Sequence, residues 1–196
     1  MTAVLPSASP FSVLCVCTGN VCRSPATERL LQRALGPGVT VRSAGTHALV
    51  GRPVEPEVAA LLKQAGADPT GFVARQLTVD DALGADLVLA LAREHRSAVV
   101  DLAPRSVRRT FTLRELARIV SALDPAELPG AVVADRLRAL VPLAGTRRQR
   151  STPVEDDVPD PYGGLSERHR LTFDTISAAV DRVAGVVAGG AAQPLG

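Results

Sequence analysis

The sequence has little of the cysteine from which secreted frameworks and many metal sites are built. Its 196 residues contain three cysteines, and all of them lie in one short stretch, at Cys15, Cys17 and Cys22. An odd and clustered set is a poor disulfide framework, so it favours a reducing compartment, and we expect the cytoplasm. The three thiols also lack the C-x2-C spacing of a zinc knuckle, so a zinc site is not expected.

Lysine, net charge and long apolar runs are scarce as well. Lys63 is the only lysine and the formal net charge is only +2, which argues against a binder of nucleic acid or of membrane surfaces. No apolar run approaches the roughly 20 residues of a membrane-spanning helix. The opening MTAVLPSASPFS has no basic or long apolar region, so no signal peptide is expected. We expect one domain over residues 1–196, with flexible tails at 1–10 and 189–196.

Apolar runs that alternate with helical periodicities are what the sequence does contain. The predicted strands cover residues 11–17, 39–43, 86–92 and 106–110. The predicted helices cover residues 26–35, 55–65, 93–102, 113–123, about 132–140 and a long stretch after 166, with Ser24 and Ser166 as possible N-caps. This alternation predicts an α/β fold with a parallel sheet covered by helices on both faces.

Residues 124–157 are the least regular part of the sequence. They run into GTRRQRSTPVEDDVP, in which a basic cluster precedes an acidic one. Such a charge pattern is typical of a solvated loop, and the alternative is a mobile flap that contributes to substrate choice.

The segment CTGNVCRS links the first predicted strand to the first predicted helix. Gly19 and Asn20 tolerate the positive φ of a tight loop, which directs successive N–H groups at one point beside the positive end of the helix. Arg23 adds a planar fork suited to two phosphate oxygens. The predicted phosphate-binding residues are Thr18, Gly19, Asn20, Val21, Cys22, Arg23 and Ser24.

Cys17 lies at the mouth of this predicted anion cradle. The N–H dipoles, the helix end and the arginine all favour its thiolate form. Attack of the thiolate on a phosphate monoester gives a phosphocysteine that water then hydrolyses, and Ser24 could stabilise the sulfur as a leaving group. Cys15 is expected to be a small core residue, and Cys22 either packs in the loop or acts as a resolving thiol.

The leaving oxygen needs a proton, and a carboxylic acid is the natural donor. Asp160 is the predicted general acid because the flanking prolines of VPDPYGG stiffen its segment. Asp156 and Asp157 lack this setting and rank behind it. Tyr162, the only tyrosine, is the predicted substrate rim, where it could form a wall for an aryl group. The remaining candidates, His47, His95 and His169, are expected to be surface or capping residues.

VLCVCTGNVCRSPATE resembles the N-terminal signature of the low-molecular-weight protein tyrosine phosphatases, and VPDPYGG resembles that family's general-acid loop. SAGT, ARQL and ADLVLALAREH match between them in the same order. The resemblance implies a four-stranded parallel sheet with a phosphate-binding loop of CX5R form after the first strand, and no metal or other cofactor. The catalytic residues that it implies are Cys17, Arg23 and Asp160, and the residues that it implies as loop support are Asn20, Ser24 and Ser43.

The resemblance also bears on substrates and partners. It implies that the substrate is a phosphotyrosine-containing protein, and a bacterial-type tyrosine kinase is one candidate for that substrate. It also implies that the chain is a monomer or a weak dimer. Relatives that act on phosphoarginine tend to carry threonine after the loop asparagine, and Val21 at that position favours tyrosine. A small-thiol-coupled arsenate reductase on the same fold is the alternative, and a non-catalytic phosphoprotein-binding module is a third reading. The chain departs from the family at Phe72, usually a histidine, and at Gly163, often an aromatic residue.

Overall fold

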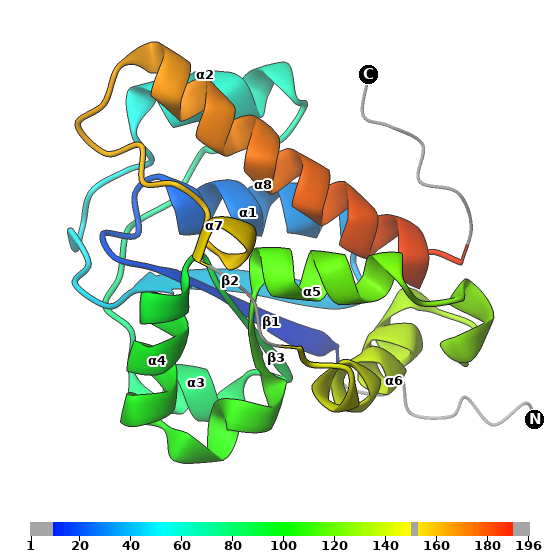
Figure 1. Ribbon diagram of the computed structural model, residues 1–196. Helices are drawn as coiled ribbons and strands as arrows, with labels where there is room; N and C mark the ends of the chain where they lie inside the picture. The colour runs from blue at the N-terminus through cyan, green and yellow to red at the C-terminus, as the bar shows by residue number, and fades with distance from the viewer. Residues whose placement is uncertain (1–9, 150–152, 190–196) are drawn as a thin grey trace, which may run out of the picture.

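The computed structural model describes residues 10–149 and 153–189, so most of the two predicted tails lies outside the described residues. Four strands form one parallel sheet in the order β2-β1-β3-β4. Their bounds are β1 Phe11–Cys17, β2 Val39–Gly45, β3 Leu87–Ala90 and β4 Thr110–Thr112. Helices lie on both sides of this sheet (Figure 1), which confirms the predicted fold class.

Eight α-helices and two short 3-10 helices surround the sheet in the described part of the chain. The α-helices are α1 Arg23–Leu35, α2 Pro56–Gln64, α3 Val79–Gly84, α4 Arg93–Leu102, α5 Leu113–Ser121, α6 Val133–Thr146, α7 Pro153–Asp156 and α8 Ser166–Val187. The 3-10 helices are η1 Pro104–Arg109 and η2 Pro125–Glu127. No helix within these described ranges is long and apolar enough to cross a bilayer.

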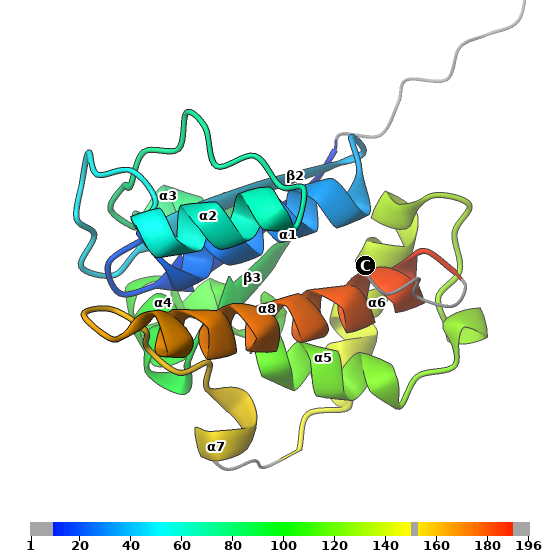
Figure 2. The same ribbon diagram turned by 90° about the horizontal axis from the view of Figure 1, so that it is seen from above.

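The two sides of the sheet pack against different helices. The larger core joins one face of the strands to α1, α5 and α8, and the long α8 lies across both α1 and α5 (Figure 2). A smaller core lies on the other face, where Leu14 and Val88 meet Val99 of α4. All four residues of β3 are buried, as expected of a parallel strand covered on both faces.

Several element boundaries differ from the sequence prediction. Residues 106–109 belong to η1 rather than to a strand, because Pro104 starts a helical turn, and β4 begins only at Thr110. Helix α3 was not predicted, since it is short and polar and its start depends on a capping box between Thr78 and Asp81. The two predicted serine N-caps are wrong: Cys22 and Leu165 precede the first residues of α1 and α8.

The region predicted as a charged loop is partly helical. Helix α6 runs on to Thr146 through Pro142, because Leu137, Leu140 and Ala144 bury one side of it in the larger core. Helix α7 then forms ahead of the segment that leads to Asp160.

Candidate active site

The loop from Cys17 to Cys22 follows β1 and is held from outside by the segment after β2. Four of its carbonyl oxygens accept backbone N–H groups of that segment at 2.9–3.0 Å. The accepting carbonyls belong to Cys17, Thr18, Gly19 and Val21, and the donors are the N–H groups of Thr46, His47, Leu49 and Glu55 in the same order. In a trans peptide the N–H points opposite to the C=O, so outward carbonyls leave the next N–H groups directed to the inside of the loop.

Gly45 allows the end of β2 to approach the loop closely, because it has no side chain. A Cβ atom built on Gly45 would lie 2.4 Å from the carbonyl oxygen of Thr18. Asn20 supplies the loop's turn, with a φ of 56°, a left-handed conformation that asparagine tolerates better than most residues. Helix α1 begins at Arg23, so its positive end faces the same interior.

A chain of side-chain hydrogen bonds fixes the loop from within. Asn20 Nδ2 donates to Ser24 Oγ and to Ser43 Oγ, both at 2.9 Å. Ser24 Oγ lies 3.0 Å from Cys17 Sγ, and Asn20 Oδ1 accepts the N–H of Arg75 at 2.9 Å. Asn20, Ser24 and Ser43, whose support of the loop the resemblance implied, therefore lie in one buried network with the sulfur.

Glu28 ends this network. Ser43 Oγ donates to Glu28 Oε2 at 2.6 Å, and burial raises the pKa of the Glu28 carboxyl, although the Ser43 hydroxyl partly opposes the shift. The position at which the family usually has histidine is filled by Phe72, a buried side chain with the Arg29 guanidinium 5.8 Å from its ring centre. Phe72 contributes apolar packing and no hydrogen bond, so the loop is supported by Ser43 and by the Arg75 backbone instead.

Arg23 and Asp160 both line the pocket and form an ion pair with each other. The Arg23 side chain is 5% exposed, and its Nη2 lies 2.7 Å from Asp160 Oδ2, while the Asp160 side chain is 53% exposed. Arg23 Nη1 also donates to the carbonyl of Val158 at 3.3 Å. Val158 N in turn donates to the carbonyl of Leu91, just beyond β3. The segment VPDPYGG (residues 158–164, the acid segment) is therefore attached at the same edge of the sheet as Cys17.

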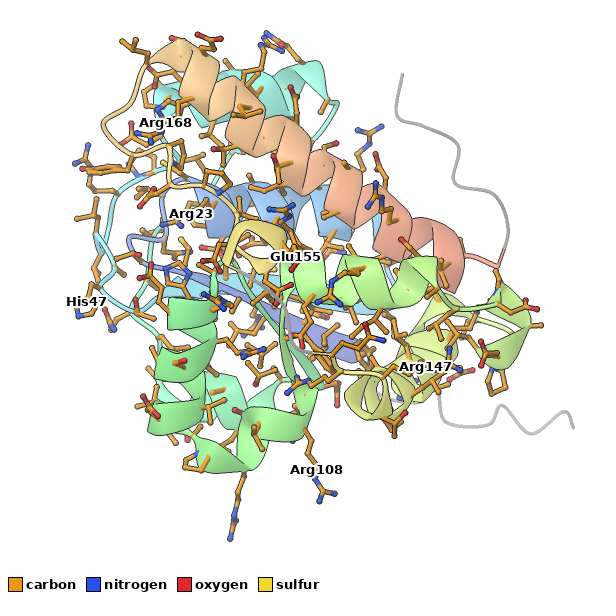
Figure 3. The ribbon with its side chains drawn as sticks, viewed as in Figure 1. Arg23, His47, Arg108, Arg147, Glu155 and Arg168 are labelled. Atoms are coloured by element: carbon orange, nitrogen blue, oxygen red, sulfur yellow. The ribbon has the colours of Figure 1, made fainter. Side chains whose placement is uncertain are left out.

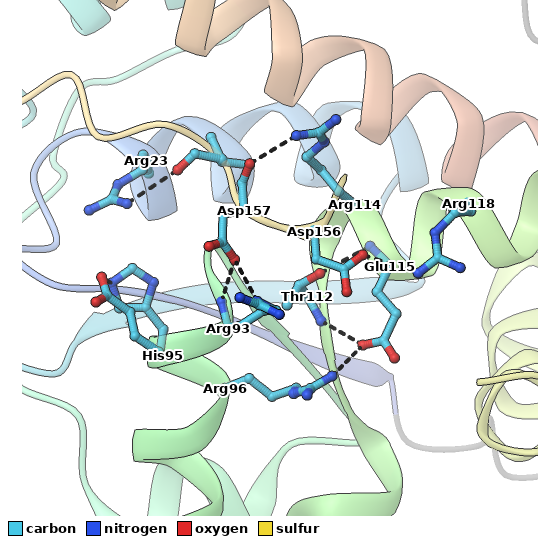
Figure 4. A network of polar contacts seen from close by, with 12 residues as sticks. Arg23, Arg93, His95, Arg96, Thr112, Arg114, Glu115, Arg118, Asp156 and Asp157 are labelled. Carbon is cyan, nitrogen blue, oxygen red and sulfur yellow. Dashed lines mark hydrogen bonds and ion pairs between the residues drawn. The ribbon is translucent and has the colours of Figure 1, made fainter. Parts of the chain in front are cut away.

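The carboxylates of the two competing aspartates, Asp156 and Asp157, bind groups outside the pocket. Asp156 is buried and pairs with Arg118 at 3.1 Å. Asp157 accepts the N–H of Arg93 at 2.8 Å. Figure 4 shows Asp157 beside Arg93 and Asp156 on the side towards Arg118. Of the three aspartates, Asp160 alone lines the pocket that contains Cys17.

This pocket has a volume of about 160 Å³ and walls that are mostly apolar. The predicted residues that line it are Cys17, Thr18, Gly19, Val21, Cys22, Arg23, Asp160 and Tyr162. His47 and Leu49 also line it and were not predicted as site residues; Figure 3 shows His47 at the same end of the molecule as Arg23. Their only sequence signal is their place just after SAGT. Among the side chains that the structure describes, none from α6 and neither Glu155 nor Asp156 of α7 lines the pocket.

Two of the histidines expected to be surface or capping residues are buried. His95 is 2% exposed, and His169 is 4% exposed. Nε2 of His95 lies 2.8 Å from Oγ1 of Thr18, which places this histidine directly behind the loop. Burial first, and then the positive charge of Arg23, lower the pKa of His95 to about 4. His47 is exposed, as predicted.

The cysteines differ in their surroundings. Cys15 is fully buried in the core, as predicted, and burial raises the pKa of its thiol. Cys22 lines the pocket, and burial together with the charge of Glu55 raises the pKa of its thiol to about 12. All three thiols are free. Within residues 10–149 and 153–189, no cluster of three or more His, Cys, Asp or Glu residues is placed to hold a metal ion.

The fold and the site together define an α/β protein with a thiol and a guanidinium in one loop at the carboxyl end of the first strand. The family model described as low molecular weight phosphotyrosine protein phosphatase matches residues 12–129. The chain therefore belongs to the low molecular weight phosphotyrosine protein phosphatase family. The match confirms the family that the sequence motifs indicated and the predicted enzyme class, protein-tyrosine-phosphatase.

Individual relatives fall into two groups. The low molecular weight protein-tyrosine-phosphatase Etp of Escherichia coli strain K12 is 46% identical over 100 residues, which is 51% of this chain and 67% of Etp. The protein-arginine-phosphatase of Geobacillus stearothermophilus is 29% identical over 175 residues, 89% of this chain and 95% of its own. The crystallised YwlE arginine phosphatase of that organism superposes with a TM-score of 0.66 at 30% identity, covering 89% of this chain and 91% of YwlE. Wzb of Vibrio vulnificus, solved with benzylphosphonate, gives 0.65 at 26% identity over 89% and 97%.

Proposed function

We propose that this chain hydrolyses phosphotyrosine and other aryl phosphate monoesters through a phosphocysteine intermediate. The observation that carries the proposal is the convergence of Cys17, Arg23 and Asp160 in one pocket, with Cys17 Sγ in contact with the Ser24 hydroxyl at 3.0 Å. Inward N–H groups and the helix end stabilise both the thiolate and the equatorial oxygens of the phosphoryl group. Ser24 donates to the sulfur and makes it a better leaving group when water attacks the intermediate.

The ion pair between Arg23 and Asp160 supports a division of labour between them. The guanidinium binds the carboxylate at 2.7 Å. A phosphate dianion in the loop competes for the same planar fork, because arginine binds two phosphate oxygens at once. Asp160 then lies near the ester oxygen, where in its protonated form it gives the leaving group a proton and later accepts one from the attacking water.

The test is hydrolysis of para-nitrophenyl phosphate and of phenyl phosphate from pH 4.5 to 8. We expect Cys17→Ser to be inactive. Asp160→Asn keeps the size of the side chain but cannot donate the proton, so it should lose about 10²–10⁴-fold on phenyl phosphate, whose leaving group needs the proton more. Cys15→Ser, a change at a buried cysteine outside the pocket, is the matched control, with folding checked by thermal melting.

The outcomes separate the proposal from its alternative. Full activity of Cys17→Ser would contradict the proposal. A reduced wild-type protein with no phosphatase activity but with arsenate-dependent consumption of a small thiol would indicate the reductase on the same fold.

A phosphoarginine substrate is the second candidate, because the Geobacillus protein-arginine-phosphatase matches 89% of this chain. Val21 lines the pocket with two methyl groups and no hydroxyl, which suits an apolar aryl ring better than a guanidinium that carries several donors. Comparison of kcat/KM on matched phosphotyrosine and phosphoarginine peptides decides between them. We expect the tyrosine peptide to be preferred and Val21→Thr to lower that preference.

A further inference from the structure

The pair formed by Thr18 and His95 has no role in the chemistry described above. Thr18 lies directly after the nucleophile and lines the pocket. His95 belongs to the first turn of α4, behind the loop, and Figure 4 shows it on the side of the polar network where Arg23 lies. The 2.8 Å contact between His95 Nε2 and Thr18 Oγ1 is the single hydrogen bond of the Thr18 side chain within the described part of the chain.

The surroundings of the imidazole determine which nitrogen carries its proton. With a pKa of about 4, His95 is neutral near pH 7 and has one N–H. Its Nδ1 is buried and has no hydrogen-bond partner among the described residues. Its Nε2 faces Thr18 and also lies 3.4 Å from Oε1 of Glu94, a carboxylate that can only accept. Buried N–H groups without a partner are rare, so the proton belongs on Nε2.

The direction of the hydrogen bond follows from this tautomer. His95 Nε2–H donates to Thr18 Oγ1, and the hydroxyl proton of Thr18 therefore remains available for another acceptor. The pocket is lined by the apolar Val21 and Leu49 and by polar side chains that include Asp160 and Tyr162. Within the described residues none of these polar side chains accepts a hydrogen bond from the Thr18 hydroxyl, whose one partner is His95. A free hydroxyl proton in such a wall finds its acceptor in an anion that enters the pocket.

We propose that the Thr18 hydroxyl, oriented by His95, is an additional hydrogen-bond donor to the phosphoryl group bound in the loop. Thr18 is then a substrate-binding residue and His95 a positioning residue that acts through it. The inference rests on the proposed function, since it takes the loop to be the phosphoryl site. It differs from that function in assigning binding to a side chain, whereas the loop's other donors, apart from Arg23, are backbone groups.

The probe is inorganic phosphate, measured by its protection of Cys17 from alkylation by iodoacetate and by its competitive inhibition constant. Hydrogen bonds to a charged group are stronger than those between neutral groups, so Thr18→Val should weaken phosphate binding about tenfold or more. Thr18→Ser keeps the hydroxyl and should bind within about twofold of wild type. Thr175→Val, which removes a hydroxyl bonded to the Leu171 carbonyl on α8, is the control outside the site.

Variants of His95 test the positioning role. His95→Leu should weaken phosphate binding as Thr18→Val does, and His95→Gln should restore much of it, because a glutamine amide can place an N–H near the position of Nε2. The double variant Thr18→Val/His95→Leu should bind phosphate no more weakly than Thr18→Val alone, since His95 acts through Thr18. Thermal melting of each variant separates weak binding from partial unfolding.

The outcomes are distinct. Normal phosphate binding by a folded Thr18→Val protein overturns the inference even if the enzyme is fully active. Effects of the two substitutions that multiply in the double variant overturn the positioning role of His95. Failure of the proposed function gives a different result from failure of this inference. In that case the wild type does not hydrolyse aryl phosphates, while protection of Cys17 by phosphate still reports on Thr18.

Discussion

The two segments that form the pocket are built in opposite ways. In the loop after β1 and the first residues of α1, Asn20, Arg23 and Ser24 are all buried, and hydrogen bonds hold both the backbone and the side chains. In the acid segment, Asp160 and Tyr162 are about half exposed, and the hydrogen bonds that tie the backbone to other elements lie ahead of these two side chains, at Val158 and Pro159. Anion binding by backbone dipoles requires fixed geometry, whereas a proton donor that must release Arg23 and meet a substrate needs freedom to move.

Breaking the rigid segment should have the largest effect, and Gly45→Ala is the most direct way to do so. The new Cβ would lie 2.4 Å from the Thr18 carbonyl oxygen, and backbone cannot move aside as a flexible side chain can. A displacement of about 1 Å at a reacting group can cost about 10²-fold in rate, so we expect at least that loss in kcat/KM, with a lower melting temperature. The measurement is steady-state hydrolysis of para-nitrophenyl phosphate beside a thermal melt.

Gly38→Ala is the matched control, because a Cβ at Gly38 meets no atom within 4 Å. Wild-type kinetics in Gly45→Ala would show that the loop tolerates displacement and that its rigidity is not what the pocket requires.

His95 connects the rigid loop to α4, and its contribution to stability should depend on pH. The folded protein holds the pKa of His95 at about 4, against an ordinary value of 6.5, so between these pH values the unfolded chain binds a proton that the folded chain does not. Stability from this residue is therefore complete above pH 6.5 and falls as the pH drops towards 4. Two and a half pKa units correspond to roughly 3 kcal/mol.

Urea unfolding of wild type and His95→Gln at pH 7 and pH 4.5 measures this contribution. The wild type should lose about 2–3 kcal/mol more than His95→Gln between the two pH values, because glutamine has no proton to bind. Equal losses of unfolding free energy in the two proteins would mean that His95 is already protonated in the folded state at pH 4.5, despite its burial beside Arg23.

The same contrast explains which features could be predicted from the sequence. The alternation of apolar strands with helices predicts the fold class, and the contiguous stretch from Cys17 to Arg23 predicts the loop side of the pocket. His47 and Leu49 also line the pocket, but they follow a different strand and could not be predicted from that stretch. His95 lies 77 residues from Thr18, and its exposure depends on how α4 packs behind the loop. Its neighbours Arg93 and Glu94 are charged, so the local sequence does not indicate burial. The start of α1 was misplaced because Ser24 turns towards the sulfur instead of capping the helix.

The smallest effect should come from the open segment, at Tyr162. Tyr162 is 52% exposed and lines the pocket, so its side chain contributes little buried surface to the stability of the fold. Tyr162→Leu removes an aromatic wall that can stack on a substrate ring, an interaction of about 0.5–1.5 kcal/mol. We therefore expect KM for para-nitrophenyl phosphate to rise about 2–10-fold with little change in kcat, and the unfolding free energy to stay within about 0.5 kcal/mol of wild type. Tyr162→Phe keeps the ring and should match wild type. A large loss of kcat in Tyr162→Leu would instead mean that the tyrosine side chain helps to hold Asp160 in place, because the backbone N–H that donates to Asp160 Oδ1 at 3.1 Å is kept in the variant. The segment would then be less free than its exposure indicates.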